Sequence, residues 1–209
     1  YMADSLGSLK PNDFKKITKN FKKYWANELG VHAHNNLGLA LKNSISAHKN
    51  GAKWVDATVS GMGRGPGNVV TEQLLQYLKK ELKIDINFRH LLKLKEKYFM
   101  ILKKKYNWGP NKYYSFAAKH KIHPTYIQEI LSDKRYKKKH YTEILNDLDL
   151  SGNKKFNPHK LLTPQSVFVG KPRGVWYPKD TIKNRNVIII GPGSSVRKVK
   201  NKIERLIKK

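Results

Sequence analysis

Two histidines and a glycine-rich loop are the residues of this chain best suited to chemistry. His32 and His34 are two positions apart in the segment Gly-Val-His-Ala-His. On an extended strand, side chains two positions apart point to the same face. Two imidazoles on one face can chelate a single divalent metal ion. We therefore predict that His32 and His34 are metal ligands, and the alternative is that they are core residues without a metal.

The glycine-rich loop covers residues 61–67 and reads Gly-Met-Gly-Arg-Gly-Pro-Gly. Because four of its residues lack a side chain, its backbone N–H groups can approach a bound group closely. The loop leads directly into Asn68. We expect it to bring Asn68 to the place where the two histidines lie.

Alternating strands and amphipathic helices must position these residues. Strands are expected at 1–3, 30–34 and 53–60, and helices at 11–25, 37–48 and 70–82. Strand–helix–strand repeats of this kind imply parallel strands with helical crossovers. The predicted fold class is therefore α/β, and Gly51 is expected to end the second helix.

After residue 84 the sequence predicts helices rather than alternating strands and helices. Four helices are expected at 88–106, 110–121, 124–131 and 141–148, followed by a proline-rich linker or surface loop. A strand at 187–190 then precedes a glycine turn and a helix, which is how a Rossmann-like unit begins. Gly191, Gly193 and Ser194 could bind phosphate there, or the unit could be purely structural. The predicted domains are 1–84, 85–150, 151–186 and 187–209.

Composition narrows the classes of function. The formal net charge is +28, but 36 of the 43 basic residues are lysines. Because specific nucleic-acid binders rely on arginine for bidentate contacts, a solvated basic surface is the favoured interpretation and nucleic-acid binding the alternative. The chain has no cysteine, no apolar run of membrane-spanning length and no signal-peptide pattern. A cytoplasmic location is expected.

Three motifs together carry a resemblance to a known family. They are His-x-His-Asn-Asn-x-Gly at 32–38, Val-Asp-Ala-Thr at 55–58, and Gly-x-Gly-x-x-x-Gly-Asn at 61–68. This set resembles the pyruvate-type metal-dependent aldolases and lyases, which are TIM barrels. The superfamily includes 4-hydroxy-2-oxovalerate aldolase, isopropylmalate synthase and 3-hydroxy-3-methylglutaryl-CoA lyase. Residues 2–7 resemble the preceding barrel strand of the 4-hydroxy-2-oxovalerate aldolase branch, and the likeness extends loosely through residue 150.

The resemblance implies a chemistry and a set of site residues. A divalent ion, Mn²⁺ or Mg²⁺, would act as a Lewis acid on a pyruvate enolate while a carbon–carbon bond of a 2-oxo acid breaks or forms. The metal ligands implied are His32, His34 and Asn68. Substrate contacts are implied for Ser5, His32 and Arg64, with Asp4 and Asn35 behind the ligands. Without the resemblance, Asp4 and Ser5 would be taken for the start of a turn.

The family also has a catalytic tyrosine just after a glycine near the start of its helical segment. In this chain Gly109 is followed by Pro110. Tyr113 and Tyr114 are the candidate catalytic replacements, although a tyrosine on a helix more commonly packs. The third metal ligand and the base of the family come from its first barrel strands, and this sequence begins at the match to the sixth.

The expected architecture is therefore the last three βα units of an incomplete TIM barrel, followed by a helical segment that caps it and the start of a second α/β unit. We expect such a chain to be inactive alone. Its expected partners are a 2-oxo acid substrate and either the missing N-terminal half or an oligomer partner. The alternatives are a basic nucleic-acid or polyanion-binding protein on a degenerate barrel scaffold, and an acyl-transferring synthase of the isopropylmalate synthase type.

Overall fold

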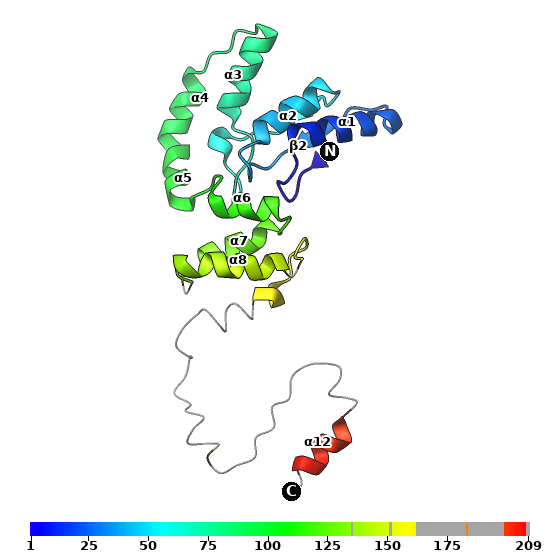
Figure 1. Cartoon of the computed structure of the whole chain (residues 1–209). Helices are drawn as coiled ribbons and strands as arrows, with labels where there is room; N and C mark the ends of the chain where they lie inside the picture. Colours follow the sequence, from blue (N-terminus) through cyan, green and yellow to red (C-terminus); the bar gives the residue numbers. More distant parts are fainter. Residues whose placement is uncertain (135, 151, 162–182, 184–198, 208–209) are drawn as a thin grey trace. The chain divides into compact units, whose positions relative to one another are not determined.

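A computed structural model describes residues 1–134, 136–150, 152–161, 183 and 199–207 (Figure 1). The chain divides into two compact units, 1–170 and 171–209. The first unit holds every element discussed below. In the second unit, helix α12 spans Lys200–Ile207. The predicted strand at 187–190 and the phosphate-site candidates Gly191, Gly193 and Ser194 lie outside the described residues.

Three short parallel strands form a sheet in the first unit. Strands β1 (Met2–Ala3), β2 (Gly30–His32) and β3 (Trp54–Val55) lie in the order β1-β2-β3. Helices α1 (Pro11–Tyr24) and α2 (Ala40–Lys49) connect them and pack side by side (Figure 1). The predicted α/β class with parallel strands is confirmed.

One face of the sheet carries the core of this part of the chain. Met2 pairs with Val31, which pairs with Val55, and these side chains pack with the buried Phe14 of α1. Because side chains alternate along a strand, the neighbours of these residues lie on the opposite face. There Tyr1 and Trp54 are 75% and 56% exposed. The helices therefore cover one face of the sheet and leave the other open.

Two predicted strands are shorter than expected. The strand predicted at 30–34 ends at His32, because His34 instead forms an isolated antiparallel bridge with Asn68. The strand predicted at 53–60 ends at Val55, and residues Val59–Gly61 form a 3₁₀ turn, η1. Here Thr58 pairs with residues 69–71 rather than with β2. Residues 69–71, which follow the glycine-rich loop, thus form the backbone hydrogen bonds with Thr58 that β2 would form in a longer sheet.

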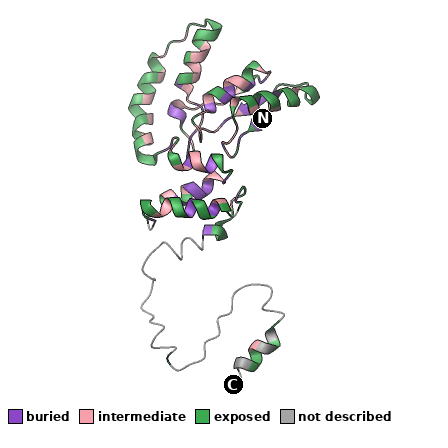
Figure 2. Cartoon of the chain, in the orientation of Figure 1, coloured by how far each residue is buried: buried purple, intermediate pink, exposed green. Residues whose placement is uncertain are grey.

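A helical hairpin follows the loop. Helix α3 (Thr71–Leu82) is followed by a continuous helix made of α4 (Arg89–Leu94), a π-helical stretch η2 (Lys95–Phe99) and α5 (Met100–Tyr106). The single helix predicted at 88–106 is confirmed, although its pattern did not reveal the π-helical stretch. No described residue of α4, η2 or α5 is buried (Figure 2).

A second core lies among the helices that follow. These are α6 (Lys112–Lys119), α7 (Pro124–Ser132) and α8 (Tyr141–Leu150), with 3₁₀ turns η3 (Lys138–His140) and η4 (Pro158–Leu161). Tyr126 and Ile144 are fully buried at its centre. The predicted positions of the three α-helices are confirmed to within a few residues at each end. Among the described residues, no helix is long and apolar enough to span a membrane.

Candidate functional site

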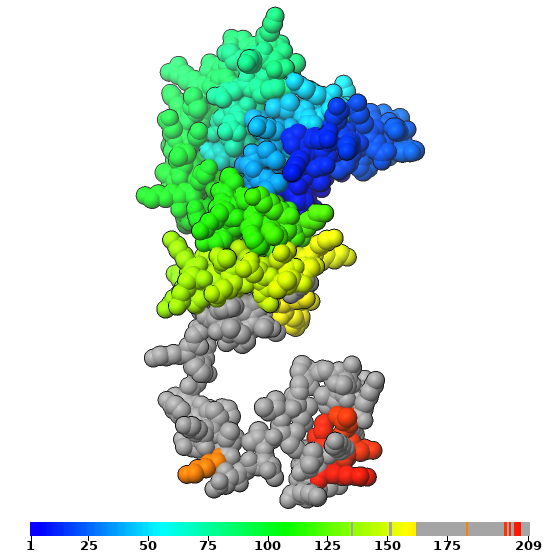
Figure 3. All heavy atoms as spheres, viewed as in Figure 1, coloured from blue at the N-terminus to red at the C-terminus, as the bar shows by residue number. Residues whose placement is uncertain are grey.

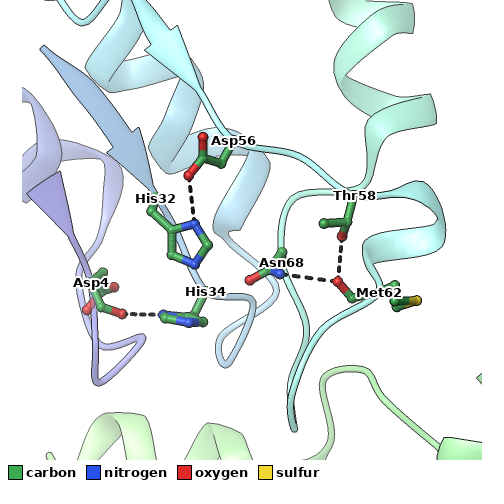
Figure 4. A network of polar contacts seen from close by, with 7 residues as sticks. All are labelled: Asp4, His32, His34, Asp56, Thr58, Met62 and Asn68. Carbon is green, nitrogen blue, oxygen red and sulfur yellow. Dashed lines mark hydrogen bonds and ion pairs between the residues drawn. The ribbon is translucent and has the colours of Figure 1, made fainter. Parts of the chain in front are cut away.

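The two predicted metal ligands lie together at the carboxyl end of β2. The ring centroids of His32 and His34 are 4.8 Å apart, with the ring planes at 83° (Figure 4). Both residues are partly exposed. The His-x-His spacing therefore brings two imidazoles to one place, as the strand periodicity predicts.

Each histidine is held through its Nδ1 atom. His32 Nδ1 lies 3.0 Å from Asp56 Oδ2, and His34 Nδ1 lies 2.8 Å from the backbone oxygen of Asp4 (Figure 4). A carbonyl oxygen or a carboxylate accepts a hydrogen bond, so in the neutral ring each Nδ1 carries the proton and each Nε2 keeps its lone pair. This is the tautomer in which a histidine binds a metal, with an acceptor behind the ring to fix its orientation.

Asp56 is a site residue that was not predicted from the sequence. Its place in Val-Asp-Ala-Thr and the alternation of β3 were visible, but its partner depends on the sheet register. Val31 pairs with Val55, which puts Asp56 beside His32. Because the two side chains are 44% and 32% exposed, this pair contributes little to stability. Its effect is to orient the His32 ring.

Asn68 lies beside His34, at the end of the glycine-rich loop. Its backbone pairs with His34, and its Nδ2 donates to the backbone oxygen of Met62 at 3.2 Å. That bond leaves Oδ1 on the side facing the histidines (Figure 4). The turn that delivers Asn68 requires Gly67, which has a φ of +77° and where a Cβ would lie 2.4 Å from the oxygen of Gly61. An amide oxygen is a suitable ligand for a hard divalent ion.

Asp4 and Asn35 hold the backbone around the histidines. The buried Asp4 carboxylate accepts hydrogen bonds from the N–H groups of Ser8 and Leu9 at 3.2 and 3.0 Å. Burial raises the pKa of Asp4, although these hydrogen bonds oppose the rise. Asn35 Oδ1 accepts from the Ala40 N–H at the start of α2, at 3.2 Å. Both side chains thus accept hydrogen bonds from backbone N–H groups of the turns that position His34.

The donor set fits part of a metal site. The described residues contain no cluster of three or more histidine, cysteine or carboxylate side chains able to hold a metal. Two imidazole Nε2 atoms and the Asn68 amide oxygen are the donors that these residues bring together. They match one side of a coordination sphere, and further ligands would have to come from water, substrate or another segment.

A buried carboxylate fixes the start of the glycine-rich loop. Ser60 has a left-handed backbone (φ 54°), and its N–H donates to both carboxylate oxygens of Glu72, at 3.2 and 3.0 Å. Lys95 Nζ lies 3.5 Å from Glu72 Oε1, and Trp108 Nε1 donates to the Ser60 oxygen at 3.1 Å. A non-glycine residue in this conformation persists only where its surroundings hold it. Glu72 therefore anchors the turn from which the loop departs.

The helical segment packs directly on this loop. Arg64 donates from Nε to Gln128 and from Nη2 to Thr125 Oγ1, the latter at 3.3 Å. The Gly109 N–H donates to the Gly65 oxygen at 2.9 Å. Figure 3 shows residues after 107, in green, in contact with the blue and cyan N-terminal part. Arg64, a predicted substrate contact, is thus held by α7 across the loop.

Of the remaining predicted residues, Ser5 and Tyr114 lie near the glycine-rich loop, whereas Tyr113 lies in the core of the helical segment. Ser5 is exposed and lines a small pocket together with His34 and Arg64. Tyr114 is buried with its hydroxyl beside Gly65, and burial raises its pKa to about 12, with Arg64 opposing. Tyr113 packs edge-on against Tyr141, with ring centroids 5.2 Å apart, in the core of the helical segment. Of the two tyrosines, Tyr114 is the one placed at the loop.

Comparison with known proteins agrees with this geometry, since residues 1–97 match the model of the HMGL-like family. Residues 1–97, called the HMGL-like segment below, are therefore similar to that family. The 4-hydroxy-2-oxovalerate aldolases of Carboxydothermus hydrogenoformans and Thermus thermophilus are each 44% identical to this segment, over 80 and 81 residues. These stretches cover 38% of this chain and 24% and 23% of the relatives. The resemblance predicted from the motifs is confirmed.

Solved structures extend the likeness beyond the HMGL-like segment. The N-terminal domain of a candidate aldolase from Bacteroides vulgatus is 37% identical, with a TM-score of 0.59, over 63% of this chain and 44% of that one. The carboxyl transferase domain of Rhizobium etli pyruvate carboxylase, solved with 3-hydroxypyruvate, is 14% identical with a TM-score of 0.60. That match covers 99% of this chain and 44% of that one, and it shows a shared fold of TIM-barrel type. The chain spans about a quarter of the length of the curated relatives it matches.

Proposed function

We propose that this chain is part of a cytoplasmic divalent-metal-dependent aldolase or lyase that cleaves or forms a carbon–carbon bond of a 2-oxo acid. The observation that carries the proposal is the pair of Nε2 atoms left available when Asp56 and Asp4 hold the Nδ1 atoms of His32 and His34. The names of the relatives, 4-hydroxy-2-oxovalerate aldolases, support this class of reaction.

The residues have distinct roles in this proposal. His32, His34 and Asn68 would hold Mn²⁺ or Mg²⁺, which supplies the Lewis acid that stabilises charge on an enolate of pyruvate. Asp56 keeps His32 in the ligand tautomer. Ser5 and Arg64, in the wall beside His34, would contact the substrate. The hydrogen bond from Trp108 Nε1 to the Ser60 oxygen and the contacts of Arg64 with α7 would fix the glycine-rich loop beside the site.

We further propose that the three strands are the last three of a TIM barrel, so the chain is inactive without more barrel strands. A TIM barrel needs eight βα units. Among the described residues, β1 pairs on one side alone, and so does β3. The open sheet face carries His32 beside the exposed Tyr1 and Trp54. Strands from an N-terminal half or an oligomer partner would cover that face and supply the missing ligands.

Calorimetric titration of Mn²⁺ into the purified chain tests the metal site. We expect binding at micromolar levels in the parent chain and its loss in His32→Ala/His34→Ala. The matched control is His90→Ala/His159→Ala, which removes two exposed histidines elsewhere and should leave binding unchanged. Equal binding by the parent and the His32/His34 variant would overturn the proposed site.

A second experiment tests the reaction class. The N-terminal half of a 4-hydroxy-2-oxovalerate aldolase, supplied in trans, should restore metal-dependent release of pyruvate from a 4-hydroxy-2-oxo acid. The His32→Ala/His34→Ala variant should not respond. Pyruvate release at the same rate without a metal, or in the double variant, would contradict the assignment.

The lysine-rich surface supports polyanion binding as the second candidate. The described helix from Arg89 to Tyr106 is exposed and includes Lys103, Lys104 and Lys105. If nucleic-acid binding were the function, affinity for DNA would fall steeply with salt and would be unaffected by His32→Ala. Binding that is independent of salt, or no binding at low salt, would exclude it.

A further inference from the structure

A small pocket lies beside His34 where the glycine-rich loop meets the start of α7. Its volume is about 150 Å³. The polar residues in its wall come from four segments and are Ser5, His34, Asn36, Arg64, His123, Thr125 and Gln128. None of the residues that line it, all in the described part of the chain, is acidic. The pocket therefore combines a permanent positive charge with neutral hydrogen-bonding groups.

Asn36 is the unusual member of this wall. It is 1% exposed, and neither its Nδ2 nor its Oδ1 has a hydrogen-bond partner in the protein. Its backbone oxygen is held by Ser115 Oγ of α6 at 3.0 Å. Gly7 makes room for the side chain, because a Cβ there would lie 1.9 Å from Asn36 Oδ1. A buried amide without partners is costly, and Asn36 is one of the residues that line this pocket.

Arg64 and His123 add donors to the same pocket. Arg64 uses Nε and Nη2 to contact Gln128 and Thr125, and a guanidinium has five N–H donors in all. His123 Nδ1 accepts from the Thr125 N–H at 3.3 Å, so the proton of the neutral ring is on Nε2. Burial lowers the pKa of His123, and the charge of Arg64 lowers it further, which keeps the ring neutral near pH 7.

We propose that this pocket binds an anionic group, a carboxylate or a phosphate, at the end of the substrate that lies away from the carbon undergoing reaction. The anion would pair with the remaining N–H donors of Arg64 and accept from the Asn36 amide. The volume is large enough for one such group. Its assignment to substrate rests on the proposed function, whereas anion binding by the pocket does not. The enzyme would then select a carbonyl partner with a negatively charged end.

Titration followed by ¹⁵N–¹H correlation spectroscopy of the metal-free chain tests this inference. The probes are succinate, inorganic phosphate and the neutral succinamide, at constant ionic strength. We expect one or both anions to shift the side-chain amide signal of Asn36 in a saturable way, and succinamide to leave it unchanged. Saturation by succinate alone assigns a carboxylate end group, and saturation by phosphate alone assigns a phosphate ester.

Two variants distinguish anion binding in the pocket from non-specific anion binding to the basic surface. Arg64→Gln should weaken anion binding about tenfold or more, because it removes charge-assisted hydrogen bonds to the anion. The control Arg89→Gln removes an equal charge at an exposed site on α4 and should change nothing. Asn36→Asp places a like charge in the wall and should abolish binding, and if it does not fold, Arg64→Gln still decides.

Three results would overturn the anion pocket. They are an unshifted Asn36 amide with both anions, an equal response to succinamide, and equal weakening by Arg64→Gln and Arg89→Gln. Because no metal is present, these results leave the histidine site untouched. Conversely, loss of Mn²⁺ binding in the proposed-function experiment would not alter the anion titration.

Discussion

Replacing Asp56 by asparagine tests how the histidine pair is kept ready for a metal. An amide of the same shape can still accept from His32 Nδ1, but this neutral hydrogen bond is weaker than the one to a carboxylate. Loss of such a supporting carboxylate typically weakens metal binding by about 10- to 100-fold, or about 1.4–2.7 kcal/mol. The same change should lower the free energy of unfolding by less than about 1 kcal/mol, because both side chains are well exposed.

The assay compares Mn²⁺ titration with thermal unfolding for the same protein. The matched control is Asp85→Asn, which breaks a 3.1 Å ion pair with Lys79 at a carboxylate that is 98% exposed. This control should bind Mn²⁺ as the parent does. If Asp56→Asn binds Mn²⁺ within twofold of the parent, Asp56 does not position His32 and the reasoning from the Nδ1 contacts fails.

Three further predictions concern stability. Phe14→Ala should lower the free energy of unfolding by about 3–5 kcal/mol in urea, because this ring is 0% exposed; a loss below about 1 kcal/mol would contradict its place in the core. Gly67→Ala should cost about 1–3 kcal/mol and weaken Mn²⁺ binding, because the turn before Asn68 must open; unchanged affinity would show that Asn68 is not a ligand. Burial raises the pKa of Glu72, but hydrogen bonds from backbone N–H groups and the charge of Lys95 outweigh burial and leave it below its usual value. The stability that this carboxylate provides is therefore present above its unfolded pKa of about 4.3 and lost as the pH falls through the folded value. The melting temperature of the parent should fall more steeply than that of Glu72→Gln across this acidic range, and parallel curves would refute the role of the charge.

Much of the fold was predictable from local patterns. The apolar spacing within 88–106 and 124–131 places helices where the structure has them, because a helical period is a property of neighbouring residues. The His-x-His spacing likewise brings two imidazoles together wherever the backbone is extended. The predicted strand at 53–60 was wrong beyond Val55, because Thr58 and the residues after it pair with the returning chain. Alternation alone does not show which partner takes a strand's hydrogen bonds.

In the candidate site, some features could be predicted from the sequence and others depend on tertiary structure. The sequence by itself indicated His32, His34 and Asn68 as candidate ligands of one metal, because their residue types and the glycines before Asn68 can be read locally. Tertiary structure alone decided that Asp56 stands behind His32, because that contact depends on the register of two strands. It also decided that Arg64 meets Thr125 and Gln128, 61 and 64 residues away, beside an unpaired Asn36. Contacts of that separation follow from how helices pack on a loop, which no spacing along the chain encodes.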